Sequence, residues 1–204
     1  MTNLFIVGLT GSTGAGKSEV ARMMAERPSW IVIDADVLSR RVVEPGQPAL
    51  KELTERFSSD ILHSDGTLNR KRLAEKAFSS QEKTEALNAI VHPAVRSEIQ
   101  RELTEAAEQG KTIAVIDAPL LLQAGLDAIC DYTLAVVSTP QLRQSRILAR
   151  DGLTVEEARR RMSAQPTDDY YETRVTAVLH NLGERDSLIR AAQTVCETIE
   201  GLVV

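Results

Sequence analysis

The sequence contains few aromatic residues and few cysteines. Phe, Tyr and Trp make up 3% of its 204 residues, and Cys130 and Cys196 are its two cysteines. The hydrophobic core must therefore consist mainly of Val, Ile, Leu and Ala. Because the cysteines are far apart and form no CxxC pair, we interpret them as reduced core thiols of a cytosolic protein.

Long apolar runs and an excess of basic charge are also missing. No apolar run approaches the ~18 residues that a membrane helix needs. The first residues, MTNLFIVGLTG, lack the basic region and long apolar segment of a signal peptide. We therefore expect a cytoplasmic protein with no membrane partner. The formal charge of −5 argues against a nucleic-acid partner, although the basic clusters 70–72 and 159–161 could be either solvated helix faces or sites for small anions.

Apolar runs of strand length alternate with helical patterns. Because the runs are nearly continuous, they are typical of parallel strands buried on both faces. Helical patterns lie between them and predict an α/β protein with a mainly parallel five-stranded sheet. The expected strands are 4–9, 30–33, 113–116, 132–137 and 175–179, and the expected helices 17–27, 140–150 and 185–200.

Residues 35–110 do not fit a simple crossover between two strands. They contain helical patterns at 48–57, 69–78 and 80–109, and we expect the last helix to break near Pro93. A connection of this length indicates an inserted helical lobe. A second, smaller helical excursion, 140–170, is rich in arginine.

The segment GSTGAGKS, residues 11–18, fits the phosphate-loop pattern G-x-x-x-x-G-K-[ST] through Gly11, Gly16, Lys17 and Ser18. Glycines let such a loop direct backbone N–H groups at phosphate oxygens, and the following helix adds its positive dipole end. Lys17 can reach the β- and γ-phosphates, and the Ser18 hydroxyl can bind Mg²⁺. An apolar run before the segment and a helical pattern after it support nucleotide binding.

A phosphate loop alone does not distinguish among nucleotide-binding classes. The sequence lacks the Asn-Lys-x-Asp stretch of GTPases and the Leu-Ser-Gly-Gly signature of transporter ATPases. A short chain with helical insertions favours a kinase that encloses a small acceptor and excludes water. A nucleotide-binding switch or a catalytically silent module is an alternative, against which the intact Lys17, Ser18 and Asp36 argue.

Two aspartates, Asp34 and Asp36, follow the second apolar run. In an open parallel sheet, ligands bind beyond the carboxyl ends of the strands, where the phosphate loop also begins. Asp36 is therefore our candidate base for the acceptor hydroxyl, and Asp34 a candidate helix N-cap. Alternatively, both residues only cap the helix. Asp117, after the third run, is either a Mg²⁺-binding carboxylate or a strand terminus before Pro119.

Several segments carry a resemblance to one family through their order and spacing. They are GLTGSTGAGKSEVA, IDAD, EPGQPAL, DGTLNRKRLAEKAF, LNAIVHPAVR, APLLLQAG, QLRQSRILARDGLTVEEARRRMSAQ and VLHNLG. Together they resemble the dephospho-CoA kinase family over nearly the whole length. The resemblance implies transfer of the ATP γ-phosphate to the ribose 3′-hydroxyl of dephospho-CoA, with Mg²⁺, in the last step of coenzyme A synthesis.

The resemblance also implies a P-loop NTPase fold with αβα layers and three parts. A nucleotide-binding core would comprise residues 1–34, 111–139 and 171–204. A helical CoA-binding lobe would comprise 35–110, and a small helical lid 140–170. We expect a single such domain that acts as a monomer or a weak homo-oligomer.

Site residues follow from the same resemblance. Arg146 and Arg150 could clamp phosphates from one helix face, or form a solvated face instead. Asn181 and Gly183 could line an adenine pocket or form a plain turn. His92 and Pro93 would open a helix that faces the acceptor, or form a plain helix start. The implied catalytic residues are Lys17, Asp36 and Arg146; those holding ATP are Gly11, Gly14, Ala15, Gly16, Lys17, Ser18, Glu19, Arg146, Arg150, Asn181 and Gly183; those binding the acceptor are Asp36, Arg40, Arg70, His92, Pro119, Leu120 and Gln165.

Some residues depart from the family pattern. Ser12 and Thr13 stand where the family usually has Gly-Ile, Glu19 replaces a Thr, and Gln123 replaces a Glu. A carboxylate at position 19 is unfavourable near phosphates unless it points away. A shikimate-kinase-like acceptor is the alternative within kinases, but those enzymes carry a run of glycines and this sequence has no adjacent Gly-Gly.

Overall fold

The computed structural model of the protein describes residues 4–203. The chain divides into two compact units. The first, which we call the sheet unit, comprises the residues up to Ile33 and those from Glu105 onward. The second, the helical unit, comprises Asp34–Thr104. The further division into core, lobe and lid stays a prediction.

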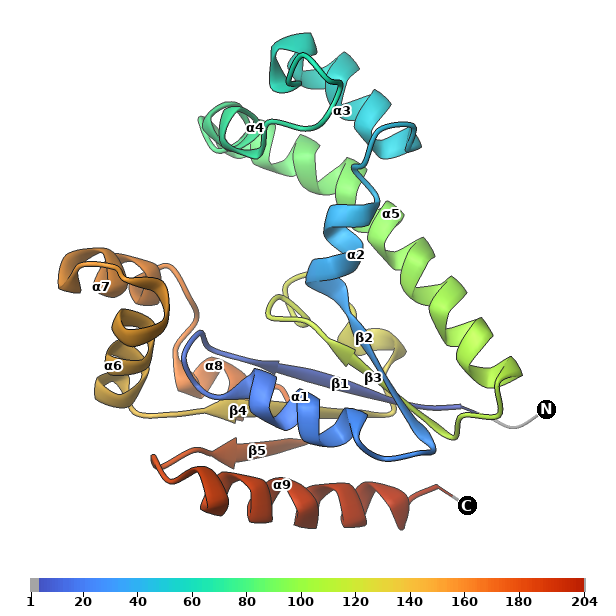
Figure 1. The fold of residues 1–204 in the computed structure, drawn as a ribbon, viewed down its shortest axis with the longest axis vertical. Helices are drawn as coiled ribbons and strands as arrows, with labels where there is room; N and C mark the ends of the chain where they lie inside the picture. The colour runs from blue at the N-terminus through green and yellow to red at the C-terminus, as the bar shows by residue number, and fades with distance from the viewer. Residues whose placement is uncertain (1–3, 204) are drawn as a thin grey trace. The chain divides into compact units, whose positions relative to one another are not determined.

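Five strands form one sheet in the order β2-β3-β1-β4-β5 (Figure 1). β1 pairs in parallel with β3 and with β4, and β4 pairs in parallel with β5. The predicted mainly parallel sheet is therefore confirmed. The strands are β1 (Phe5–Gly11), β2 (Trp30–Asp34), β3 (Ile113–Asp117), β4 (Tyr132–Val137) and β5 (Ala177–His180).

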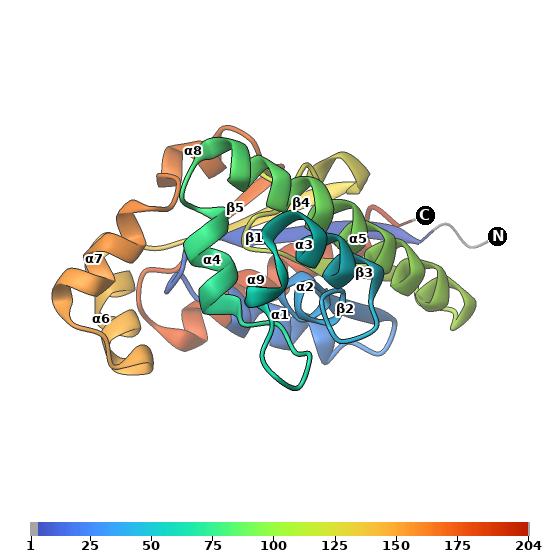
Figure 2. The same ribbon diagram turned by 90° about the horizontal axis from the view of Figure 1, so that it is seen from above.

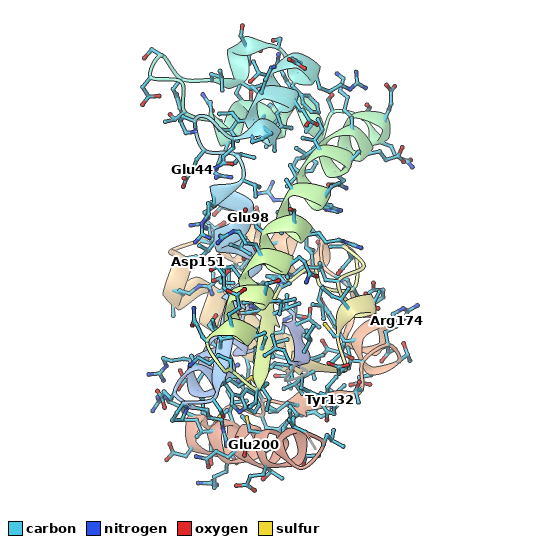
Figure 3. All side chains as sticks on the ribbon, turned by 90° about the vertical axis from the view of Figure 1, so that its right-hand side faces the viewer. Glu44, Glu98, Tyr132, Asp151, Arg174 and Glu200 are labelled. Carbon is cyan, nitrogen blue, oxygen red and sulfur yellow. The ribbon has the colours of Figure 1, made fainter. Side chains whose placement is uncertain are left out.

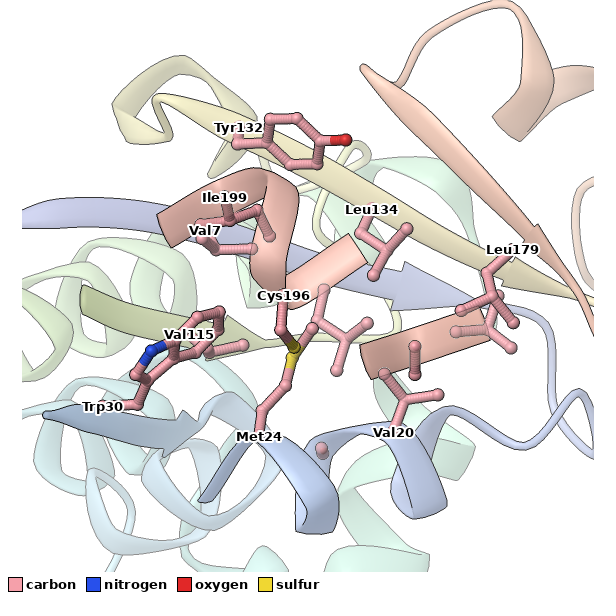
Figure 4. Packing of buried hydrophobic residues seen from close by; sticks show 14 of the residues in the cluster. Val7, Val20, Met24, Trp30, Val115, Tyr132, Leu134, Leu179, Cys196 and Ile199 are labelled. Atoms are coloured by element: carbon pink, nitrogen blue, oxygen red, sulfur yellow. The ribbon is translucent and has the colours of Figure 1, made fainter. Parts of the chain in front are cut away.

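Helices α1 (Lys17–Ala25) and α9 (Arg185–Glu200) contact each other and cover the main core of the sheet unit. Branched aliphatic side chains dominate this core, as the low aromatic content predicts. Trp30 is an exception: its ring is buried, and its indole N–H donates at 3.2 Å to Oε1 of Glu200, which is labelled in Figure 3. Figure 4 shows core members from both helices and from the strands, among them Val7, Val20, Met24, Val115, Leu134, Leu179, Cys196 and Ile199.

Three further helices follow β4 in the sheet unit. Helix α6 (Pro140–Asp151) starts at the N-cap Thr139 with proline in its first turn and ends at Gly152, whose φ of 64° is left-handed. Helix α7 (Val155–Ser163) begins with a capping box and lies against α6 (Figures 1 and 2). Helix α8 (Asp168–Glu172) packs on β4 and β5 through the buried ring of Tyr171. A short 3₁₀ turn, η2 (Asp127–Ile129), precedes β4.

The helical unit contains no strand of the five-stranded sheet beyond the last residue of β2. Helix α3, the 3₁₀ turn η1 and α4 contact one another and bury a small apolar cluster. The elements are α2 (Ala35–Arg41), α3 (Pro48–Phe57), η1 (Ser59–Ile61), α4 (Arg70–Ala77) and α5 (Gln81–Glu108), whose last residues belong to the sheet unit.

Helix α5 corrects one expectation. It runs without interruption over 28 residues with Pro93 inside it, so the expected break near Pro93, and a helix start there, are wrong. An internal proline removes one hydrogen bond and costs about 3 kcal/mol. The buried Val95, Ile99 and Leu103 anchor the later turns of this helix. Within residues 4–203, no helix has the length and apolar character needed to cross a membrane.

Candidate nucleotide-binding site

The phosphate loop, residues 11–18, joins β1 directly to α1. Strand β1 ends at Gly11, and Gly14 and Gly16 adopt φ angles of 77° and 107°, which side chains larger than hydrogen disfavour. Gly16 is the N-cap of α1 and offers no side-chain acceptor. The N–H groups in the first turn of a helix have no intrahelical acceptor, so this end of α1 is suited to bind an anion.

The ammonium group of Lys17 forms an ion pair with the carboxylate of Asp117. Asp117 ends β3 and lies opposite Leu9 of β1, which places its carboxylate at the loop edge of the sheet. The two side chains are 15% and 9% exposed. Asp117 is thus more than a strand terminus, because it neutralises the lysine that the sequence assigns to phosphate.

A guanidinium from α6 contacts backbone carbonyls of the phosphate loop. Arg146 Nη1 donates to Gly14 O at 3.0 Å, and Nη2 donates to Asn181 Oδ1 at 3.1 Å. The Asn181 amide is buried and donates to Ala15 O at 2.7 Å, while Gly183 N donates to Asn181 Oδ1 at 3.1 Å. The structure therefore brings these five predicted residues together, with Arg146 and Asn181 bound to loop carbonyls.

In the helical unit, Asp34 and Asp36 lie where β2 ends and α2 begins. Asp34 Oδ1 accepts from Asp36 N at 2.8 Å and from Val37 N at 3.0 Å, so the predicted N-cap is confirmed. Asp36 lies in the first turn of α2 with an exposed side chain. Its role as a base stays a prediction.

The other predicted acceptor residues of this unit lie on three different helices. Arg40 is exposed in the last turn of α2, and Arg70 is exposed at the start of α4. His92 is half-buried in the middle of α5. Their contact with an acceptor also stays a prediction.

Comparison with known proteins identifies the family of this chain. A family model described as dephospho-CoA kinase matches residues 5–186. A dephospho-CoA kinase of Corynebacterium glutamicum is 44% identical over 182 residues, which cover 89% of this chain and 90% of that protein. The chain belongs to the dephospho-CoA kinase family.

Solved structures agree with this fold. A Thermus thermophilus protein superposes with a TM-score of 0.81 at 32% identity, over 96% of this chain and 98% of that one. Dephospho-CoA kinase from Campylobacter jejuni superposes with a TM-score of 0.62 at 20% identity, over 95% of this chain and 96% of that one. Shikimate kinase from Acinetobacter baumannii superposes with a TM-score of 0.55 at 16% identity, over 98% of this chain and 95% of that one. The predicted P-loop kinase fold is therefore confirmed, and likeness of fold alone leaves the acceptor open.

Glu19, a departure from the family pattern, points toward α9. Its Oε1 accepts from Arg22 Nη2 at 2.6 Å and from Arg185 Nε at 2.7 Å. Although partial desolvation works in the opposite direction, hydrogen bonds from these two guanidinium groups hold the pKa of Glu19 below its ordinary value. The two cations offset the negative charge that would otherwise face phosphates at the start of α1.

Arg150 is not brought to the phosphate loop. Its Nε and Nη2 donate to the two carboxylate oxygens of Asp151 at 2.7 and 2.9 Å, and Arg161 donates to the same carboxylate at 2.7 Å. Asp151 is labelled in Figure 3. The spacing of four residues puts Arg146 and Arg150 on one helix face, but the neighbouring carboxylate engages only the second. A phosphate clamp by Arg150 requires release from Asp151 and stays a prediction.

Two predicted acceptor residues follow β3. Pro119 O accepts from Thr10 Oγ1 at 3.2 Å, and Leu120 is 58% exposed. Gln123 is also exposed. The structure thus places a partly apolar turn after Asp117, and the acceptor contacts of Pro119 and Leu120 stay predictions.

Sequence reasoning missed Arg143, which is 5% exposed on α6. Its guanidinium contacts the phosphate loop and Gln165, the residue that we predicted to bind the acceptor. The signal in the sequence was its spacing of three from Arg146, which places both side chains on one helix face.

Proposed function

We propose that the protein is a dephospho-CoA kinase that transfers the γ-phosphate of ATP to the ribose 3′-hydroxyl of dephospho-CoA, forming coenzyme A and ADP. The observation that carries this proposal is 44% identity to a dephospho-CoA kinase over 89% of the chain. The complete phosphate loop with Lys17 supports it, since a catalytically silent relative would not require that lysine.

In this proposal, the loop N–H groups and Lys17 bind the ATP phosphates. Arg146 holds the loop in place through its hydrogen bonds to Gly14 O and Asn181 Oδ1. Mg²⁺ would be bound by the Ser18 hydroxyl, phosphate oxygens and water. The described chain has no group of three or more His, Cys, Asp or Glu residues that could hold a metal. This fits Mg²⁺, which usually keeps several waters and binds with substrate phosphates. Asp117 could join the ion through water once Lys17 turns to the phosphates.

We also propose Asp36 as the group that orients the acceptor hydroxyl and takes its proton. Asp36→Asn should retain the KM for ATP and lower kcat on the order of 10²-fold or more. Asp34→Asn is the matched control, because Asn caps a helix about as well as Asp, and it should keep its kcat. A near-wild-type kcat for Asp36→Asn would return this residue to a purely structural role.

The proposal is tested by ADP formation with Mg-ATP and either dephospho-CoA or shikimate as acceptor. We expect ADP production that depends on dephospho-CoA and a product with the mass of coenzyme A. Turnover of shikimate without turnover of dephospho-CoA would contradict the proposal. Sedimentation of the same preparation tests the monomer or weak homo-oligomer prediction, and a cytoplasmic location also stays a prediction.

A further inference from the structure

Arg143 is a buried charge to which the proposed chemistry assigns no role. It lies on α6 with 5% of its surface exposed. Burying a guanidinium is costly unless its donors find acceptors and its charge finds a partner. The groups that supply these partners therefore indicate what the residue does.

The first partner is Thr13 in the phosphate loop. Arg143 Nε donates to Thr13 O at 3.1 Å. The N–H of the same residue donates to Gln165 Oε1 at 2.9 Å, and Arg143 Nη2 donates to that oxygen at 3.3 Å. Both polar backbone groups of Thr13 are thus held by side chains from outside the loop.

The backbone of α6 approaches the next loop residue equally closely. A Cβ atom added to Gly14 would lie 2.8 Å from Arg143 O and 3.1 Å from Arg143 Cα. The main chain of Arg143 therefore packs directly on Gly14 while its side chain binds Thr13. Two independent contacts from one residue fix the position of the loop against α6.

The charge partner is the carboxylate of Asp168 at the start of α8. Arg143 Nη1 lies 3.6 Å from Asp168 Oδ1. Gln165 precedes α8 by a few residues, in the segment between α7 and α8. Arg143 consequently connects the phosphate loop with Gln165 and with the start of α8.

We propose that Arg143 and Gln165 form a brace that positions the phosphate loop for ATP, and we call Thr13, Arg143, Gln165 and Asp168 the loop brace. In this assignment Gln165 acts on ATP through Thr13 and does not bind the acceptor. A loop that is already held in its binding conformation loses less conformational entropy when ATP binds. The KM measurements below rest on the proposed function, whereas the Kd for ATP does not.

The test compares Gln165→Leu and Arg143→Met with Arg190→Met, the same change at an exposed arginine on α9. Each brace variant loses hydrogen bonds to the loop, and we expect the Kd for ATP to rise about 10-fold. The KM for ATP should rise in parallel, while the KM for dephospho-CoA stays within about 2-fold. Arg190→Met should leave all three unchanged.

Coupling within the brace gives a second readout. Because Gln165 Oε1 accepts from both Thr13 N and Arg143 Nη2, the double variant should raise the Kd for ATP by less than the product of the single effects. Arg143→Lys keeps the charge but not the planar fork of donors, so it should restore only part of the ATP affinity. Melting curves of every variant separate these effects from unfolding.

Three outcomes would overturn the proposal. A rise in the KM for dephospho-CoA alone in Gln165→Leu would make that residue an acceptor contact. Unchanged ATP affinity in folded Gln165→Leu would show that the loop needs no brace, and this variant decides the matter if Arg143→Met does not fold. If the two substitutions raise the Kd for ATP by the full product of their single effects, the contact between Arg143 and Gln165 does not contribute to the brace. The Kd for ATP needs no acceptor, so it tests the brace even if dephospho-CoA is not phosphorylated.

Discussion

Replacement of Gly14 by alanine tests the close packing of α6 on the phosphate loop. Gly14 has a φ of +77°, and a Cβ atom there would meet three backbone atoms of Arg143 at 2.8, 3.1 and 3.3 Å. Backbone atoms of a helix cannot rotate away as a flexible side chain could. The substitution must therefore strain the loop and push it from α6.

The magnitude has two parts. The left-handed conformation costs an alanine about 1–2 kcal/mol, and a forced backbone shift adds about 1–3 kcal/mol. Gly110→Ala isolates the first part, because Gly110 has a nearly equal φ of +74° and nothing lies within 4 Å of its added Cβ. The effect of alanine on the unfolded chain is the same in both variants and cancels in the comparison.

The assay is urea unfolding of both variants and the wild type, followed by circular dichroism. We expect Gly110→Ala to lose about 1–2 kcal/mol and Gly14→Ala to lose about 1–3 kcal/mol more, with weaker ATP binding in Gly14→Ala alone. Equal losses in the two variants would refute the close contact between Gly14 and Arg143.

Three further predictions follow from other parts of the chain. Lys17→Met removes a cation that donates hydrogen bonds to the ATP phosphates, and it should lower kcat by on the order of 10²–10³-fold. Steady-state turnover near that of the wild type would contradict the role of Lys17. Pro93 is exposed inside α5, so Pro93→Ala should restore a helix hydrogen bond and raise the melting temperature, corresponding to about 1–3 kcal/mol; a lower melting temperature would be inconsistent with an intact helix. Burial raises the pKa of Cys130 to about 12 and that of Cys196 to about 11, so both stay protonated thiols until the pH approaches those values. Alkylation at pH 8 should be slow in the folded protein and fast in urea. Fast labelling of the folded protein would contradict the raised pKa values of the half-buried Cys130 and the buried Cys196.

Local patterns in the sequence were enough for the sheet and the phosphate loop. The near-continuous apolar runs predicted five strands, and the structure moved β5 only slightly, to Ala177–His180. Gly16, Lys17 and Ser18 were predicted as phosphate-binding residues because the binding of phosphate by a loop followed by a helix depends on neighbouring residues, and the structure places them at the start of α1. Asp34 was predicted as a cap for the same reason, since its acceptors lie two and three residues away.

Contacts between distant segments could not be predicted in this way. Arg143 became recognisable only when α6 was placed against Gly14 and Thr13, which are about 130 positions earlier in the chain. The spacing of Arg146 and Arg150 predicted a shared face, but not that Asp151 would engage Arg150. Pro93 misled because local propensity favoured a break, whereas the packing of later α5 residues maintained the helix.

The chemical identity of the product decides whether this chain phosphorylates the ribose 3′-hydroxyl of dephospho-CoA. The full chain is incubated with Mg-ATP and dephospho-CoA, and the purified product is examined by mass spectrometry and ³¹P NMR. We expect one added phosphate as a monoester on the ribose 3′-oxygen, in an amount equal to the ADP formed. A phosphate at another position, or ADP formed without a phosphorylated acceptor, would contradict this expectation.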